Sequence, residues 1–169
     1  MKKLTLLIIA GVCFGFSGFA PITLKAENPG REAYKAFSFI HGKWQQEIEI
    51  EGTKTIEQGK CEGSAGNCNI WIGEKGTFIF GYDPKTKKWR GVGHLDDGSR
   101  MVREYPMPAA EQGTKVTFSQ TTWHTDGTKT IGTGNFTFLG PDSFHEETKN
   151  IDQDGKKLPT ITSITKRIK

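Results

Sequence analysis

The sequence predicts an all-β domain: an up-and-down barrel of about ten strands, preceded by a short N-terminal helix. Turn-forming residues recur after Trp44 at the short spacing that is typical of hairpins. Eleven Phe, four Trp and three Tyr stand among 21 Gly, a composition that suits pleated, half-buried surfaces and tight turns. A chain of 169 residues can bury one core but is short for two. We therefore expect a single domain over residues 27–169.

The first residues have the pattern of an export signal. Lys2 and Lys3 precede an apolar run from Leu4 to Ala20, which is short for a membrane span and has no charged stop-transfer cluster behind it. We expect residues 1–26 to be a signal peptide that is cleaved after Ala20 or Ala26. The mature protein would then be exported, periplasmic or secreted, with no membrane span.

The charge of the chain changes when the leader is set aside. The 23 Lys and Arg include three lysines of the leader, and without them the basic residues are nearly balanced by the 19 Asp and Glu. The rest of the chain has no stripe of Lys and Arg of the kind that binds nucleic acid or an anionic membrane. We expect neither partner, and we expect a monomer.

Two cysteines remain when Cys13 is removed with the leader. Cys61 and Cys68 are separated by the segment Glu-Gly-Ser-Ala-Gly-Asn, and an exported protein meets an oxidising compartment. This predicts a disulfide across a turn. A metal site is not expected, because no His lies beside these residues and their spacing is not that of a zinc knuckle.

The elements follow one another as a meander. Arg31 to Phe39 predicts a short helix that caps one end of the barrel. Trp44 to Ile50 alternates between the two faces of a half-buried strand. The strands expected after it are Lys54 to Gly63, Cys68 to Gly73, Thr77 to Tyr82, Lys88 to Leu95, Ser99 to Tyr105, Lys115 to Trp123, Lys129 to Leu139, Ser143 to Ile151 and Lys157 to Ile168.

Three Asp-Gly pairs interrupt these strands, at Asp97-Gly98, Asp126-Gly127 and Asp154-Gly155. The last lies in Asp-Gln-Asp-Gly, which is similar to the start of a calcium-binding loop. An EF-hand loop also needs a Glu at its twelfth position and a helix on each side. Because the chain continues toward a strand instead, we expect these aspartates to form hairpin turns.

The two ends of the meander resemble those of the lipocalin and fatty-acid-binding (calycin) barrels. The chain opens with Gly42-x-Trp44 and closes with Lys166-Arg167, and Gly81-Tyr82-Asp83-Pro84 lies between them. More narrowly, it is similar to lipocalin-like bacterial proteins catalogued as a domain of unknown function. The resemblance implies that Trp44 plugs the closed end and that Arg167 lies across its ring, a cation over an aromatic face. The Thr-Asp-Tyr segment of true lipocalins and their long helix before the last strand are missing, which favours the plainer ten-stranded relatives.

Polar residues on otherwise apolar strand faces are the candidate pocket. Alternation along the strands places one such residue on each of five apolar faces. The candidate ligand-binding residues are Tyr82, His94, Glu104, Gln120 and Glu146. The faces of one or more strands could be reversed, because a slip of one residue inverts every side chain.

The function that this pattern favours is the binding of a small, partly apolar or amphipathic molecule inside the barrel. One alternative is a hydrolase or isomerase-like enzyme that uses Glu104 or Glu146 as acid or base, and another is a filled structural or interaction barrel. A haem held by one inward His is a further alternative; the four histidines are His41, His94, His124 and His145. No nucleophile elbow and no phosphate-binding glycine motif is present, so we expect no catalytic residue, metal or cofactor.

Overall fold

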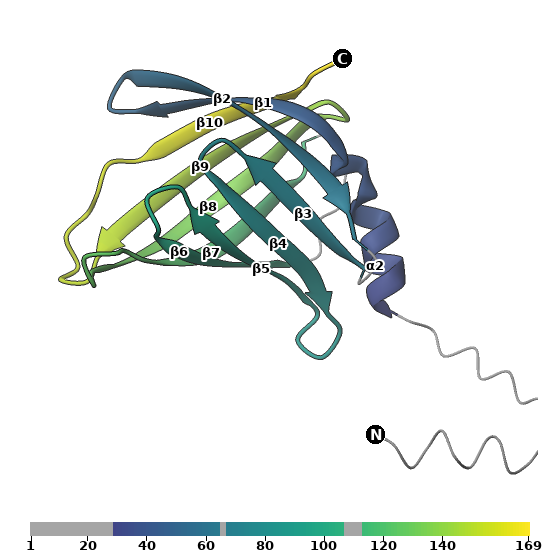
Figure 1. Cartoon of the computed structure of the whole chain (residues 1–169), viewed down its shortest axis with the longest axis horizontal. Coiled ribbons are helices and arrows are strands. Elements are labelled where there is room, and N and C mark those ends of the chain that lie inside the picture. The colour runs from purple at the N-terminus through teal and green to yellow at the C-terminus, as the bar shows by residue number, and fades with distance from the viewer. Residues whose placement is uncertain (1–28, 65–66, 107–112) are drawn as a thin grey trace, which may run out of the picture.

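The structure is a computed structural model that describes residues 29–64, 67–106 and 113–169. These residues form a closed antiparallel barrel of ten strands with a short helix at one end (Figure 1). Each strand pairs with the next in the sequence, and the first also pairs with the last. The predicted all-β, up-and-down barrel with a short N-terminal helix is confirmed. The predicted leader, residues 1–26 with Cys13, lies outside the described residues.

The boundaries of the elements are close to those expected from the turn residues. The helix α2 (Pro29–Phe37) continues into the 3-10 turn η1 (Ser38–Ile40). The strands are β1 (Gly42–Ile50), β2 (Thr53–Gly63), β3 (Cys68–Gly73), β4 (Gly76–Asp83), β5 (Lys88–Leu95), β6 (Arg100–Pro106), β7 (Lys115–Trp123), β8 (Lys129–Gly140), β9 (Ser143–Asp152) and β10 (Ile161–Arg167). Only β10 begins well after its expected start, because Pro159 has no N–H to donate to a ladder.

The Asp-Gly pairs form turns, as expected. Gly98, Gly127 and Gly155 have φ of 83°, 85° and 83°, in the left-handed region that glycine adopts without strain. The carboxylates of Asp97 and Asp126 each accept a 2.8 Å hydrogen bond from the backbone N–H two residues later. These carboxylates are therefore occupied in shaping the turns.

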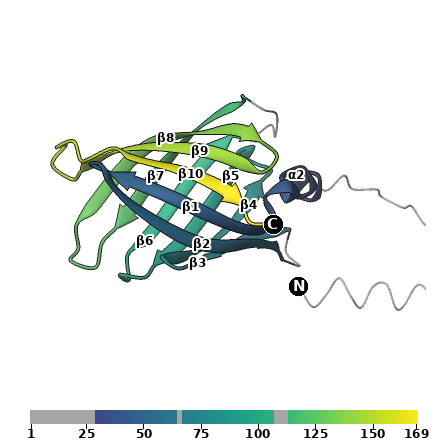
Figure 2. The ribbon, with the colours of Figure 1, turned by 90° about the horizontal axis from the view of Figure 1, so that it is seen from above.

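Aromatic side chains fill the end of the barrel where α2 lies. Phe37 of α2 packs on the ring of Trp89, with 4.7 Å between the ring centroids, and Trp89 is fully buried. The same cluster holds Ala33, Tyr105, Val116, Phe118 and Phe138. Figure 2 shows α2 at one end of the barrel and the turn between β1 and β2 at the other. The helix therefore covers the aromatic end of the barrel.

The outer surface carries a row of mostly β-branched side chains, which we call the outer row. Ile79, Val92, Val102, Thr121 and Ile131 are successive cross-strand neighbours on β4 to β8. Ile79 is 52% exposed and Val92 is 42% exposed. Such residues suit a pleated surface whether or not it is buried. The residues that alternate with them on β5 and β6 face into the barrel.

Within the described part of the chain, no helix has the length and apolar character that crossing a membrane requires.

Candidate functional site

Trp44 and Arg167 meet where the first and last strands close the barrel. They are directly opposite each other in the β1–β10 ladder, and the guanidinium carbon of Arg167 lies 4.3 Å from the centroid of the Trp44 ring. Trp44 is 1% exposed, and its indole N–H donates to the carbonyl of Ile40 over 2.7 Å. The pair therefore also holds the 3-10 turn against the barrel.

The guanidinium of Arg167 ties three segments together. It donates to the carbonyls of Phe39 and His41 over 2.6 and 2.5 Å, and to the carboxylate of Asp142 over 2.7 Å. Gly42 has φ of 135°, and a Cβ at this position would overlap Nη1 of Arg167. Glycine is needed here for both reasons, since the backbone is in a region that other residues avoid and the guanidinium occupies the space.

A cavity of about 240 Å³ lies inside the barrel, inward of α2. Its lining is mainly aromatic. The lining residues are Phe37, Ile40, Gln46, Trp71, Phe78, Phe80, Gly91, Met101, Arg103, Tyr105, Val116, Phe136, Phe138, Phe144, Glu146 and Thr165. Inward glycines give the rings room: a Cβ at Gly93 would lie 2.7 Å from the Phe78 ring, and one at Gly59 would lie 2.8 Å from Trp71. Large aromatic rings inside the barrel thus pack directly against the backbone of glycines.

Arg103 is the centre of a buried polar network at this cavity. Its Nη2 lies 3.0 Å from Oε1 of Glu146 and donates to Oε1 of Gln120 over 2.7 Å. Its Nε also donates to Gln120, over 3.2 Å. The guanidinium carbon lies 4.2 Å from the Phe118 ring centroid. A planar cation over a ring, paired with a carboxylate, is the arrangement in which an arginine is tolerated inside a protein.

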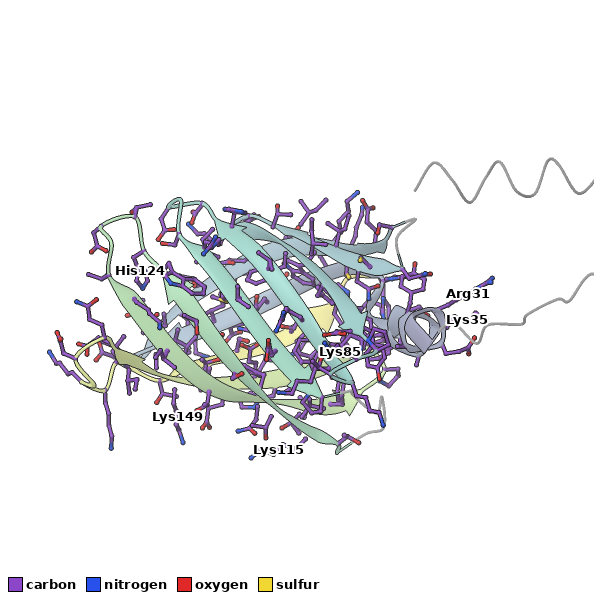
Figure 3. The ribbon with its side chains drawn as sticks, turned by 90° about the horizontal axis from the view of Figure 1, so that it is seen from below. Arg31, Lys35, Lys85, Lys115, His124 and Lys149 are labelled. Carbon is purple, nitrogen blue, oxygen red and sulfur yellow. The ribbon has the colours of Figure 1, made fainter. Side chains whose placement is uncertain are left out.

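The partners of Arg103 are themselves held by hydrogen bonds. Thr148 donates to Glu146 over 3.1 Å, and the side-chain amide of Gln120 donates to Asn150 over 3.2 Å. In Figure 3 the side chain of Lys149, between Thr148 and Asn150, extends away from the barrel, as alternation on β9 requires. The network therefore spans β6, β7 and β9 on the inner side of the sheet.

Three of the five predicted ligand-binding residues lie on the inner face. Gln120 and Glu146 are brought together by Arg103. Tyr82 shares the inner face of β4 with Phe80, and its ring centroid lies 6.1 Å from that of Trp89, but it does not line the cavity. Two predicted positions thus join one polar site, and the third belongs to the aromatic end.

The predictions for His94 and Glu104 are wrong, because both side chains lie outside the barrel. His94 is exposed, and Glu104 pairs with Arg90 across the outer face. Alternation along the sequence places each of them inward, on the same face as Val92 or Val102. Those valines belong to the outer row, so the faces of β5 and β6 were inverted by one residue.

The same inversion hid Arg103, which lies between Val102 and Glu104. When Val102 is assigned to the interior, alternation along the strand assigns its neighbour Arg103 to the solvent-facing side. The signal that could have corrected this is the run Trp89-x-Gly91-x-Gly93 on β5, because paired Gly and Trp on one face indicate close inward packing.

The predicted disulfide between Cys61 and Cys68 is absent from the structure. Cys61 is opposite Trp71 in the β2–β3 ladder and shares its inner face. Cys68 is an odd number of residues from Trp71 on the same strand, so it lies on the other face of the sheet. Cysteines on opposite faces cannot direct their Cβ atoms toward each other, as a disulfide requires.

Burial raises the pKa of two groups inside the barrel, the thiol of Cys61 and the phenol of Tyr105. Cys61 is 2% exposed, and burial raises the pKa of its thiol to about 12. Burial likewise raises the pKa of Tyr105, which lines the cavity. Since the thiolate is the reactive form of cysteine, Cys61 stays protonated and unreactive at neutral pH.

None of the four histidines lines the cavity. His41 bonds through Nε2 to the Oδ1 atom of Asn69 over 2.6 Å. His124 lies toward the end of the barrel opposite α2 (Figure 3), where its Nε2 is 3.3 Å from the hydroxyl of Thr130. Among the residues that the structure describes, no group of three or more His, Cys, Asp or Glu side chains could hold a metal ion.

Among the residues that the structure describes, two buried side-chain polar atoms have no hydrogen-bond partner: Nδ2 of Asn69 and Oγ1 of Thr165. Thr165 is 1% exposed and lines the cavity, beside Gln46 in the β1–β10 ladder. A buried hydroxyl without a partner is unfavourable. The cavity thus contains one hydroxyl that a bound molecule could satisfy.

No protein-family model matches the chain, and no curated protein matches it. Among solved structures, Rv2717c from M. tuberculosis is similar over 81% of this chain and 98% of that chain, at 7% identity and a TM-score of 0.57.

Two further structures align less well. The S-type phycobiliprotein lyase CPES from Guillardia theta aligns over 82% of this chain and 92% of that chain, at 14% identity and a TM-score of 0.44. The redesigned β-barrel mFAP1 bound to DFHBI aligns over 78% of this chain and 98% of that chain, at 15% identity and a TM-score of 0.39. The similarity to Rv2717c agrees with the closed antiparallel barrel that the strand ladders show.

Proposed function

We propose that this protein is an exported barrel that binds a small, partly apolar molecule in the cavity between α2 and the Arg103 network. The observation that carries the proposal is the cavity itself, about 240 Å³ of space lined mainly by aromatic rings. Protein interiors are close-packed, and an opening of this size forfeits the packing contacts of its lining. A ligand would restore those contacts.

The lining suits an amphipathic molecule. Rings such as Phe78, Phe136 and Phe144 supply apolar area. The polar groups are few and come from Gln46, Arg103, Tyr105, Glu146 and Thr165. An apolar pocket with a small number of placed polar groups is typical of ligand sites. The polar groups would orient the ligand and the rings would supply most of its contact area.

Export of the protein is part of this proposal and rests on the sequence of residues 1–26. A basic start followed by an apolar run is the pattern of a signal peptide. Mass spectrometry of the protein isolated from its own host would find its first residue. A mature chain that begins near Glu27 would support export, and a chain that retains Lys2 and Lys3 would contradict it.

Catalysis by a pair of carboxylates is not favoured by the geometry. Glu146 is the single acidic residue that lines the cavity within the described part of the chain, whereas Glu104 lies outside. Both oxygens of Glu146 already interact with Arg103 or Thr148. A general base needs to be within reach of the proton that it takes, and here the carboxylate is engaged with the protein instead.

A second candidate function is an interaction role for the outer face, favoured by the exposure of the outer row. The row is narrow, because the charged pair of Arg90 and Glu104 lies beside it. A stable interface needs a broad apolar centre, so the narrowness of the row argues against this role. Sedimentation of Ile79→Lys and Val92→Lys variants would test it. An association state lost in both variants would favour this role.

Native mass spectrometry of the protein purified from its own host tests the proposed binding. We expect a non-covalent adduct on the wild-type barrel. Met101→Trp should reduce it strongly, because Met101 lines the cavity and the larger ring would fill it. Val102→Trp is the matched control, since this neighbour on β6 lies on the outer face. An adduct that is unaffected by Met101→Trp would place the ligand elsewhere.

A further inference from the structure

The geometry points to the class of ligand: an uncharged molecule with a flat, ring-shaped apolar body and one hydroxyl or carbonyl group, which bonds to Thr165. This inference rests on the proposed function and specifies the molecule that the same cavity takes. Three features of the site carry it: an unpartnered hydroxyl, a charge-balanced interior and facing aromatic walls.

The first feature is the hydroxyl of Thr165. It is buried and lines the cavity, and no atom of residues 29–64, 67–106 or 113–169 bonds to it. On the same inner face, Gln46 donates to Ser163 over 2.9 Å, so a neighbouring hydroxyl on β10 is satisfied within the protein. A hydroxyl can donate one hydrogen bond and accept two. A ligand hydroxyl or carbonyl placed against Thr165 would therefore give this buried hydroxyl the partner that the described residues do not supply.

The second feature is the charge of the interior. Arg103 and Glu146 are the charged residues that line the cavity, one cation and one anion. They pair with each other, and their side chains are only 18% and 13% exposed. A charged ligand would add an uncompensated charge, or would have to break this pair, and both are costly in a poorly solvated site. The cavity therefore selects against carboxylates and amines.

The third feature is the arrangement of rings around the space. Trp71 and Phe78 line it from the neighbouring strands β3 and β4, and Phe136 and Phe144 line it from β8 and β9. The centroids of Phe136 and Phe144 are 5.9 Å apart at an interplanar angle of 78°. Aromatic faces and edges on several sides favour a flat ring system over a flexible chain, because rings gain from stacked and edge-to-face contacts.

Four probes that share a naphthalene body test the inference at neutral pH: naphthalene, naphthol, naphthoate and naphthylmethylammonium. Titration calorimetry on the mature protein gives each dissociation constant. We expect naphthol to bind about tenfold more tightly than naphthalene, since satisfying a buried hydroxyl corresponds to roughly that factor. Both charged probes should bind about tenfold more weakly than naphthol, or more weakly still.

The variant Thr165→Val keeps the shape of the side chain and removes the hydroxyl. It should bind naphthalene as the wild type does and lose the preference for naphthol to within about twofold. Thr162→Val is the control, because Thr162 is on the same strand and faces outward, opposite Glu147. Unchanged naphthalene affinity in Thr165→Val also shows that the variant is folded.

The outcomes separate this inference from the proposed function. If naphthalene binds as tightly as naphthol, if naphthoate or naphthylmethylammonium binds best, or if Thr165→Val keeps the preference, the assigned ligand class is wrong while binding in the cavity stands. If Met101→Trp leaves the affinity for every probe unchanged, both are overturned. If no probe binds at all, the ligand class is overturned, and the adduct in native mass spectrometry decides the proposed function.

Discussion

Arg103 and Glu146 bond to each other across the inside of the barrel, with 3.0 Å between Nη2 and Oε1. They come from β6 and β9, which are separated by β7 and β8, so this ion pair joins two walls that share no ladder. It also sets the polarity of the cavity, because it supplies both charges of the lining.

Breaking this pair from one side should be strongly destabilising. Glu146→Leu leaves the Arg103 cation buried without its partner, and we expect a loss of about 3–5 kcal/mol in the free energy of unfolding. Replacing both residues, as Arg103→Met with Glu146→Leu, should recover most of the loss. Urea denaturation of the wild type and of both variants measures these changes.

The control for that series is the neighbouring carboxylate. Glu147 is 39% exposed and bonds to Lys149 on the outer face, so Glu147→Leu should change the stability far less than Glu146→Leu does. If Glu146→Leu lowered the free energy of unfolding no more than this control does, the ion pair of Arg103 and Glu146 would contribute nothing to stability.

The closure of the barrel can be tested with a double-mutant cycle. Trp44→Ala should cost about 3–5 kcal/mol because it leaves a cavity under the 3-10 turn. Arg167→Ala should cost about 2–3 kcal/mol, since the charged group donates to two carbonyls and a carboxylate. The two losses should differ from additivity by at least about 0.5 kcal/mol, because the side chains are in contact. Strict additivity would mean that the ring and the cation act independently.

Replacement by valine should affect stability differently at two inward threonines. Thr165→Val removes a buried hydroxyl that has no partner, so stability in the absence of ligand should be unchanged or should rise. Thr148→Val removes the donor to Glu146 and should cost about 1–3 kcal/mol. Thermal unfolding of the two variants compares them directly, and equal losses would refute the assignment of Thr165 as an unsatisfied group.

Turn residues made most of the fold predictable from the sequence. Asp97-Gly98 and Asp126-Gly127 mark the ends of strands, because Asp and Gly favour a turn through local hydrogen bonds and backbone conformation. Three strands, Cys68–Gly73, Lys88–Leu95 and Lys115–Trp123, begin and end where the sequence predicted. Local signals of this kind do not depend on tertiary contacts.

The site was predictable only where the apolar residues of a strand lie on one face. On β7, Val116 and Phe118 point inward with Gln120, and alternation assigned that face correctly. In the middle of β5 the inner face holds Gly91 and Gly93 and the outer face holds Val92, so local hydrophobicity favoured the wrong side. The cross-strand neighbours that place Val92 outside are set by the whole barrel and cannot be read from β5 alone.

The buried thiol predicts how stability depends on pH. The pKa of Cys61 is raised in the folded protein from an ordinary value of 9.0 to about 12. Between these values the unfolded chain loses the proton that the folded chain keeps, so the free energy of unfolding should fall as the pH rises through this range. A Cys61→Ala variant should show a smaller fall. Urea denaturation of both proteins across this range measures the difference, and equal slopes would contradict the assignment.

Reagent accessibility tests the same thiol at neutral pH. In a protein that carries Cys13→Ser and Cys68→Ser, the remaining Cys61 should react with a thiol reagent only as fast as the barrel opens. Rapid labelling of the native protein would contradict the buried position of Cys61.

A crystal structure of the protein purified from its own host would show whether the cavity holds a ligand. We expect electron density for a small, flat molecule between Trp71, Phe78 and Phe136, with a polar atom within hydrogen-bond distance of Oγ1 of Thr165. A cavity that holds only water, or one that has collapsed so that the rings fill it, would contradict the proposal that this barrel binds a ligand.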